Sequence, residues 1–83
     1  MTGTQNGAQE IAALYETILA RKTADPTDSY SAQLLADLPR AVRKLGEEAS
    51  ETMGAALSGT DEALVGEAGD LLYHLLVVLV ARG

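Results

Sequence analysis

The segment EAGDLLYHLLVVLVA, residues 67–81, decides the fold class of this chain. At ~100° per residue, leucine and valine would cover nearly all sides of a helix, and Glu67, Asp70 and His74 would form one stripe along it. The apolar run inside the segment is well short of the ~20 residues that cross a bilayer. We therefore expect a buried helix, whose carboxylates need a partner because an unpaired buried charge is costly.

Two helices are expected near the amino terminus. Apolar residues spaced three and four apart predict an amphipathic helix over residues 8–24, which Pro26 prevents from continuing. After a loop, Ser29 is expected to cap a short second helix over residues 29–38.

A third and a fourth helix complete the expected set. Pro39 fits the first turn of the third helix, which should run to about residue 57 with Met53 among its core residues. A break at residues 58–60 separates it from the fourth helix, which should start at about Asp61. No stretch alternates with the period of a strand. The predicted fold class is all-α, a helical bundle of about four helices per chain.

The size of the chain suggests that this bundle is completed by homodimerisation. With 83 residues, one subunit is too small to cover a helix that is apolar on nearly all sides. Residues 1–8 lack the basic and apolar regions of a signal peptide, so we expect a disordered leader there and one all-α domain over residues 9–83. These features favour a cytoplasmic protein.

Charge and composition narrow the chemistry. The net charge of −6 argues against nucleic acid or an anionic membrane as a partner. The absence of cysteine excludes disulfides and thiolate metal sites. With 12 acidic residues against 6 basic ones, oxygen ligands are the plentiful kind.

Acidic residues fall on both of the last two helices. Glu48 and Glu51 lie on the third expected helix, where an acidic stripe taken alone would be an ordinary solvated face. Glu67 and Asp70 lie on the fourth expected helix, which is apolar on nearly all sides. If the short connection makes these helices antiparallel, the four carboxylates can face one another. Like charges so close either raise one another's pKa or bind a cation, and an all-oxygen cluster suits Mg²⁺, with Mn²⁺ as the alternative.

These residues carry a resemblance to a known superfamily. Glu47-Glu48-Ala49-Ser50-Glu51 followed by Glu67-Ala68-Gly69-Asp70 resembles the EExxE…ExxD signature of the all-α (MazG-type) nucleoside triphosphate pyrophosphohydrolases. The flanking segments resemble the phosphoribosyl-ATP pyrophosphohydrolase family in the right order. They are Ile18-Leu19-Ala20-Arg21-Lys22, Ser29-Tyr30-Ser31, Lys44-Leu45-Gly46-Glu47-Glu48-Ala49 and Asp70-Leu71-Leu72-Tyr73-His74-Leu75-Leu76-Val77.

The resemblance implies a Mg²⁺-dependent homodimeric enzyme that hydrolyses phosphoribosyl-ATP to phosphoribosyl-AMP and pyrophosphate, the second step of histidine biosynthesis. The implied metal ligands are Glu48, Glu51, Glu67 and Asp70. The catalytic candidates are Glu47, Glu48 and His74, with Glu47 either a fifth ligand or the group that orients the attacking water. The phosphate-binding candidates are Arg21, Lys22 and Lys44. An association with phosphoribosyl-AMP cyclohydrolase, the next enzyme of the pathway, stays open.

Simpler interpretations compete with these assignments. His74 could be a hydrogen-bonded structural histidine, and Arg21 and Lys44 could be solvated basic residues on helices. Gly69 stands where the family pattern leads us to expect alanine. Together with three other helical glycines it costs stability unless the helices approach closely.

Two other functions fit parts of the pattern. One is a house-cleaning dNTP pyrophosphatase of the same superfamily, which would use the same metal chemistry. Such pockets commonly stack an aromatic side chain on the base, and a chain with only 3 tyrosines and no other aromatic residue favours the histidine pathway instead. The other is a non-catalytic helical dimerisation module. The acidic residues on an apolar helix argue against this function.

Overall fold

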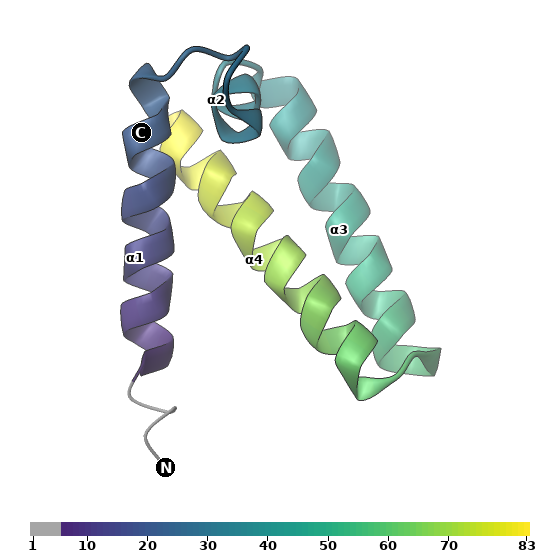
Figure 1. Ribbon diagram of the computed structural model, residues 1–83. Helices are drawn as coiled ribbons and strands as arrows, with labels where there is room; N and C mark the ends of the chain where they lie inside the picture. Colours follow the sequence, from purple (N-terminus) through teal and green to yellow (C-terminus); the bar gives the residue numbers. More distant parts are fainter. Residues whose placement is uncertain (1–5) are drawn as a thin grey trace.

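The computed structural model describes residues 6–83, and residues 1–5 lie outside that range. The described residues form four α-helices and one short 3₁₀ helix without a strand, which confirms the all-α fold class (Figure 1). The elements are α1 (Asn6–Ala20), η2 (Arg21–Thr23), α2 (Tyr30–Leu35), α3 (Leu38–Ser58) and α4 (Asp61–Arg82). The expected leader therefore falls mostly outside the described residues, and residues 6–8 belong to α1.

The arrangement places α4 at the centre of the molecule. α3 and α4 form an antiparallel hairpin, and α1 lies on the other side of α4 (Figure 1). α2 lies at the end of the hairpin where α3 begins and α4 ends, and it contacts both of these helices. The antiparallel pairing is the one that the short connection between the third and fourth helices predicts.

Polar side chains start the last three helices. The Ser29 hydroxyl accepts the Ala32 N–H at 3.2 Å at the start of α2, as expected. The Thr60 hydroxyl accepts the Ala63 N–H at 3.1 Å at the start of α4. Pro39 lies in the first turn of α3, where a missing N–H costs nothing. These caps satisfy backbone donors that have no partner within the helix.

The boundary between α2 and α3 differs from the expectation. α2 ends at Leu35, so the predicted extension to Leu38 is wrong, and Leu38 is the first residue of α3. The physical reason is Asp37, whose carboxylate accepts the Arg40 N–H at 3.2 Å. An aspartate in this position stabilises a new helix start and interrupts the preceding helix.

The hydrophobic core draws on all four α-helices. It lies toward the end of the bundle where α2 packs against α4, and its buried members come from different elements. They are Ile18 of α1, Leu34 of α2, Ala41 of α3, and Leu76, Val77 and Val80 of α4. Leu14, Tyr15, Leu35, Leu72, Tyr73 and Val78 pack against this cluster. The core thus anchors the carboxyl-terminal half of α4.

The opposite end of the hairpin is much less covered. Leu57 is 88% exposed, Val65 72% and Met53 62%. The prediction that Met53 belongs to the core is therefore wrong for a single chain, and α4 is only partly buried. Helical periodicity identified the apolar side of each helix correctly but could not say whether the same chain covers it.

Within residues 6–83, one helix meets the length and composition criteria for a membrane span. α4 has 22 residues with a mean hydropathy of 1.7 in its most apolar window. Length and composition alone do not separate a membrane helix from the core helix of a soluble protein. α4 carries Glu67, Asp70 and a buried His74, which are costly in a lipid environment.

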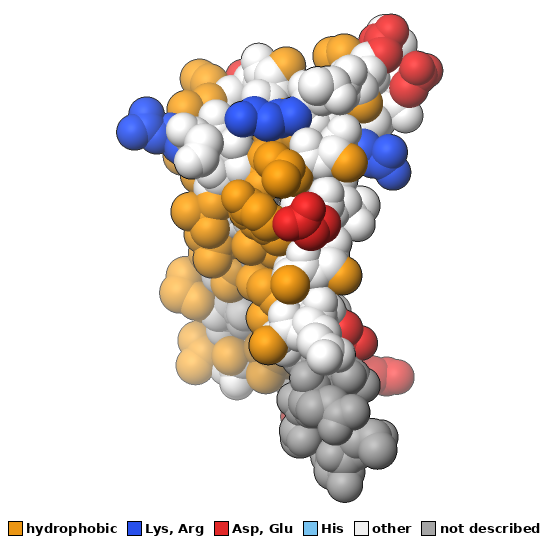
Figure 2. Space-filling model, turned by 90° about the vertical axis from the view of Figure 1, so that its left-hand side faces the viewer, with side chains coloured by type: hydrophobic (Ala, Val, Ile, Leu, Met, Phe, Trp, Pro, Cys, Tyr) orange, Lys and Arg blue, Asp and Glu red, His pale blue; other side chains and the backbone are white. Residues whose placement is uncertain are grey.

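The hydrophobic surface continues onto the side formed by α1. Figure 2 shows this side, where hydrophobic side chains gather over one half of the face. An open apolar hollow of about 320 Å³ lies here, lined by Glu10, Ile11, Leu14 and Leu72. Ile11 and Leu19 of α1 are 42% and 38% exposed.

The helical glycines are not explained by close helix packing within this chain. Apart from its chain neighbours and the nearby backbone of its own helix, a Cβ atom at Gly46, Gly54, Gly66 or Gly69 would meet no described atom within 4 Å. At Gly59, after the end of α3, the same atom would lie 2.9 Å from the Ala55 carbonyl oxygen. Close approach of the helices within residues 6–83 therefore does not account for the helical glycines, whereas Gly59 is required by its surroundings.

Alanine substitutions at these two kinds of glycine should have opposite effects. Gly54→Ala should raise the free energy of unfolding by roughly 0.5–1 kcal/mol, because alanine restricts the unfolded chain and favours the helix. Gly59→Ala should lower the stability, because its Cβ would meet backbone atoms. Urea unfolding followed by circular dichroism measures both, and two changes of the same sign would contradict this interpretation.

Candidate metal centre

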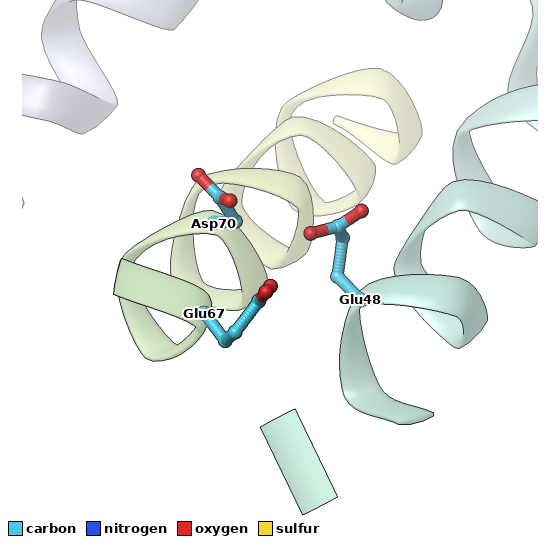
Figure 3. A group of neighbouring side chains, drawn as sticks. All are labelled: Glu48, Glu67 and Asp70. Carbon is cyan, nitrogen blue, oxygen red and sulfur yellow. The ribbon is translucent and has the colours of Figure 1, made fainter. Parts of the chain in front are cut away.

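Three carboxylates meet between α3 and α4. One oxygen atom each of Glu48, Glu67 and Asp70 lies within 4.8 Å of the others. Figure 3 shows Glu48 and Glu67 extending toward one another from the facing helices, with Asp70 above them on α4. Glu48 is 7% exposed, whereas Glu67 is half-buried and Asp70 is exposed. The group therefore has a buried end and an end open to solvent.

Helix geometry explains why these residues meet. Glu67 and Asp70 are three residues apart, so they lie on the same side of α4. The antiparallel course of α3 brings Glu48 opposite them. The turn at Gly59 and the Thr60 cap fix where α4 begins, and this sets the register of the two helices.

The electrostatics of Glu67 point to a missing positive charge. Its Oε1 atom is buried and has no hydrogen-bond partner among the described residues. Burial raises the pKa of Glu67, and the neighbouring carboxylates of Glu51, Glu48 and Asp70 raise it further. An unpartnered buried carboxylate oxygen surrounded by other carboxylates fits a bound cation.

Lys44 supplies only part of that charge. Its Nζ atom lies 3.2 Å from Glu47 Oε1 and 4.0 Å from Glu48 Oε2, and these are the ion pairs found in the described part of the chain. The hydrogen bond and charge of Glu47 are the main causes that raise the pKa of Lys44. Lys44 thus pairs with α3 carboxylates, and no ion pair within residues 6–83 involves Glu67 or Asp70.

His74 lies beside the site and is held by two partners. Its Nδ1 atom is 2.7 Å from the Asp70 carbonyl oxygen, and its Nε2 atom is 3.4 Å from the Tyr30 hydroxyl. Because a carbonyl oxygen only accepts, Nδ1 carries the hydrogen, and Nε2 can accept from Tyr30. The Tyr73 ring packs edge-on against the imidazole with ring centroids 4.9 Å apart. His74 is buried and fixed in orientation.

The remaining candidates do not belong to the three-carboxylate group. Glu51 is exposed on α3, where it contributes to the raised pKa of Glu67 but does not belong to the closest group. Glu47 is exposed and holds Lys44. Arg21 and Lys22 are exposed in η2, where they stand in its last turn. The structure thus brings together three of the four expected ligands.

Fold and site define a small all-α protein in which three carboxylates that could hold a metal ion meet between two antiparallel helices. A family model described as phosphoribosyl-ATP pyrophosphohydrolase matches residues 11–83. The chain therefore belongs to the phosphoribosyl-ATP pyrophosphohydrolase family.

Individual relatives agree with this family. The chain is 59% identical to the phosphoribosyl-ATP pyrophosphatase of Erythrobacter litoralis (strain HTCC2594), over 84% of this chain and 68% of that protein. It is 56% identical to the phosphoribosyl-ATP pyrophosphatase of Roseobacter denitrificans, over 83% of this chain and 67% of that protein. It is 48% identical to the phosphoribosyl-ATP pyrophosphatase of Rhizorhabdus wittichii, over 100% of this chain and 74% of that protein. The chain thus spans roughly two thirds to three quarters of these relatives.

Neutralising Glu67 should affect the metal-free and metal-bound proteins in opposite ways. Because its pKa is raised in the fold, Glu67 favours folding below the ordinary value of 4.5, and this contribution is lost as the pH rises through the higher folded-state pKa. At pH 7 in EDTA, Glu67→Gln should therefore raise the Tm. In millimolar Mg²⁺ the wild type should gain more Tm than the variant, because a ligand that binds only the folded state stabilises it.

Thermal melts by circular dichroism in EDTA and in Mg²⁺ provide the comparison. The matched control is Glu16→Gln, which neutralises an exposed glutamate on α1 and should change Tm little in either buffer. A lower Tm of Glu67→Gln in EDTA, or an equal gain in Mg²⁺ for wild type and variant, would contradict the cation centre.

Proposed function

We propose that this chain hydrolyses phosphoribosyl-ATP to phosphoribosyl-AMP and pyrophosphate, the second step of histidine biosynthesis. Membership of the family and relatives named phosphoribosyl-ATP pyrophosphatase support this activity. The observation that carries it is the group of Glu48, Glu67 and Asp70, with its unpartnered buried oxygen, on the residues of the family-like acidic motif.

The donor set suits a hard divalent cation. Glu48, Glu67 and Asp70 would hold Mg²⁺, or Mn²⁺ in its place, and Glu51 could add a carboxylate from one turn farther along α3. When bound, the ion would offset the charge that develops on the phosphate oxygens and lower the pKa of a bound water. The open side near Asp70 leaves room for phosphate oxygens and water.

The other polar residues would bind the phosphates, orient the attacking water or hold the site in place. Lys44 already reaches the edge of the site, so its ammonium can donate to a phosphate oxygen when Glu48 turns to the cation. Glu47 would be a further ligand or the base that orients the attacking water. His74 would hold the Asp70 segment of α4 in place rather than touch the reacting atoms. Arg21 and Lys22 stay candidates for phosphate contacts from η2.

The exposed apolar residues support a homodimer as the working form. Leu57, Met53 and Val65 are large hydrophobic side chains without cover at one end of the α3–α4 hairpin, and Leu79 near the end of α4 is 52% exposed. A surface of this kind on so small a chain favours association with a second copy. The proposal also includes a cytoplasmic location and an association with phosphoribosyl-AMP cyclohydrolase.

The mass in solution tests the dimer. We expect twice the 8.7 kDa of one chain by multi-angle light scattering at micromolar concentration. Leu57→Glu should shift the equilibrium toward the monomer, because it places a charge on the exposed apolar end of α3. Glu62→Gln, at an exposed position in the first turn of α4, is the control. A wild-type protein that stays monomeric would overturn the proposal.

The activity assay compares phosphoribosyl-ATP with the four dNTPs at saturating Mg²⁺. We expect the highest kcat/KM for phosphoribosyl-ATP, with pyrophosphate as product. Glu48→Gln and Asp70→Asn should each lower kcat/KM by about 100-fold or more, because each keeps the shape of the side chain and removes a ligand charge.

Glu62→Gln also serves as the control for the activity assay, because it neutralises a carboxylate of α4 in its first turn, outside the three-carboxylate group. Near-wild-type activity of both site variants would show that the acids hold no catalytic metal. Faster turnover of a dNTP than of phosphoribosyl-ATP would instead favour the house-cleaning function.

A further inference from the structure

We propose that Thr52 is a positioning residue that sets the spacing of α3 and α4 at the cation centre. This inference rests on the proposed metal site and deepens it. The Thr52 side chain lies between the backbones of two residues whose carboxylates belong to the site, Glu48 and Glu67.

The contacts of the Thr52 hydroxyl join the two helices. Its Oγ1 atom is 2.8 Å from the Glu48 carbonyl oxygen of α3 and 3.1 Å from the Glu67 carbonyl oxygen of α4. A hydroxyl has one hydrogen, which these two acceptors share. Thr52 is half-buried, so little water competes for this hydrogen. The same hydroxyl therefore ties together the main chains that carry the two ligands.

Other hydroxyl groups show what is distinctive about Thr52. Thr17 donates to the Ala13 carbonyl oxygen at 3.0 Å within α1, and Ser58 donates to the Gly54 carbonyl oxygen at 3.2 Å within α3. Both make the common bond to the carbonyl four residues earlier. Thr52 makes this bond too, and its hydroxyl also donates to the Glu67 carbonyl oxygen on a different helix.

The link acts where the helices are under electrostatic stress. Ionised carboxylates of Glu48 and Glu67 repel one another when no cation is bound, and this repulsion opposes the close packing of α3 and α4. Mg²⁺ demands near-ideal octahedral geometry at about 2.0–2.1 Å, whereas Ca²⁺ accepts flexible coordination at about 2.3–2.6 Å. A small increase in the separation of the helices should therefore weaken Mg²⁺ binding more than Ca²⁺ binding.

Metal titrations of three variants test this role. Thr52→Val keeps the shape of the side chain and removes the hydroxyl, Thr52→Ser keeps the hydroxyl, and Thr17→Val removes a comparable bond in α1. Dissociation constants for MgCl₂ and CaCl₂ are measured by isothermal titration calorimetry on the full chain, together with the Tm in EDTA. Thr52→Ala replaces Thr52→Val if circular dichroism shows that the valine variant does not fold.

We expect Thr52→Val to weaken Mg²⁺ binding about tenfold or more and Ca²⁺ binding clearly less, so that the ratio of the two constants changes. Thr52→Ser and Thr17→Val should keep the wild-type ratio. A Thr52→Val protein with a lower Tm but an unchanged ratio would make Thr52 merely structural and overturn the inference. Wild-type protein that binds neither cation would overturn the proposed centre itself, and the inference with it.

Discussion

Mutual repulsion of carboxylates between two packed helices is the constraint on which this structure depends. Glu48 and Glu67 lie on facing sides of α3 and α4, and the nearest ammonium group, on Lys44, is held mainly by Glu47. A single chain could relieve the repulsion by moving the helices apart. The apolar core and the Thr52 contacts hold them together instead, so the repulsion is relieved either by a proton, which the raised pKa of Glu67 favours, or by a bound cation.

The two ends of the α3–α4 hairpin differ in how far their apolar side chains are buried. At the end next to α2, buried side chains such as Leu34, Val77 and Val80 fix the helices against one another. The acidic residues follow within the next turns, close enough to the core to be held in place and open enough on the Asp70 side to receive phosphate oxygens. At the far end, exposed Leu57 and Val65 offer a surface that suits a second copy of the chain.

Local chemistry in the sequence predicted much of this fold. The cap at Ser29 and the position of Pro39 in the first turn of α3 depend on single residues, and the acidic stripe of α4 follows from helical periodicity, so all three could be located from the sequence. The burial of Met53 could not be predicted, because periodicity identifies an apolar side but not the surface that covers it. Thr52 escaped notice because its significance lies in a contact with α4, fifteen residues along the chain, which depends on the register of the packed helices.

The most direct test of the cation centre is the position of the ion itself. A crystal structure of the protein grown with Mn²⁺, with diffraction data collected to give an anomalous difference map, locates the metal without any assumption about its ligands. We expect a peak between α3 and α4 at about 2.0–2.3 Å from carboxylate oxygens of Glu48, Glu67 and Asp70. A map without a peak there, or with Mn²⁺ bound only at exposed acids such as Glu16 or Glu62, would contradict it.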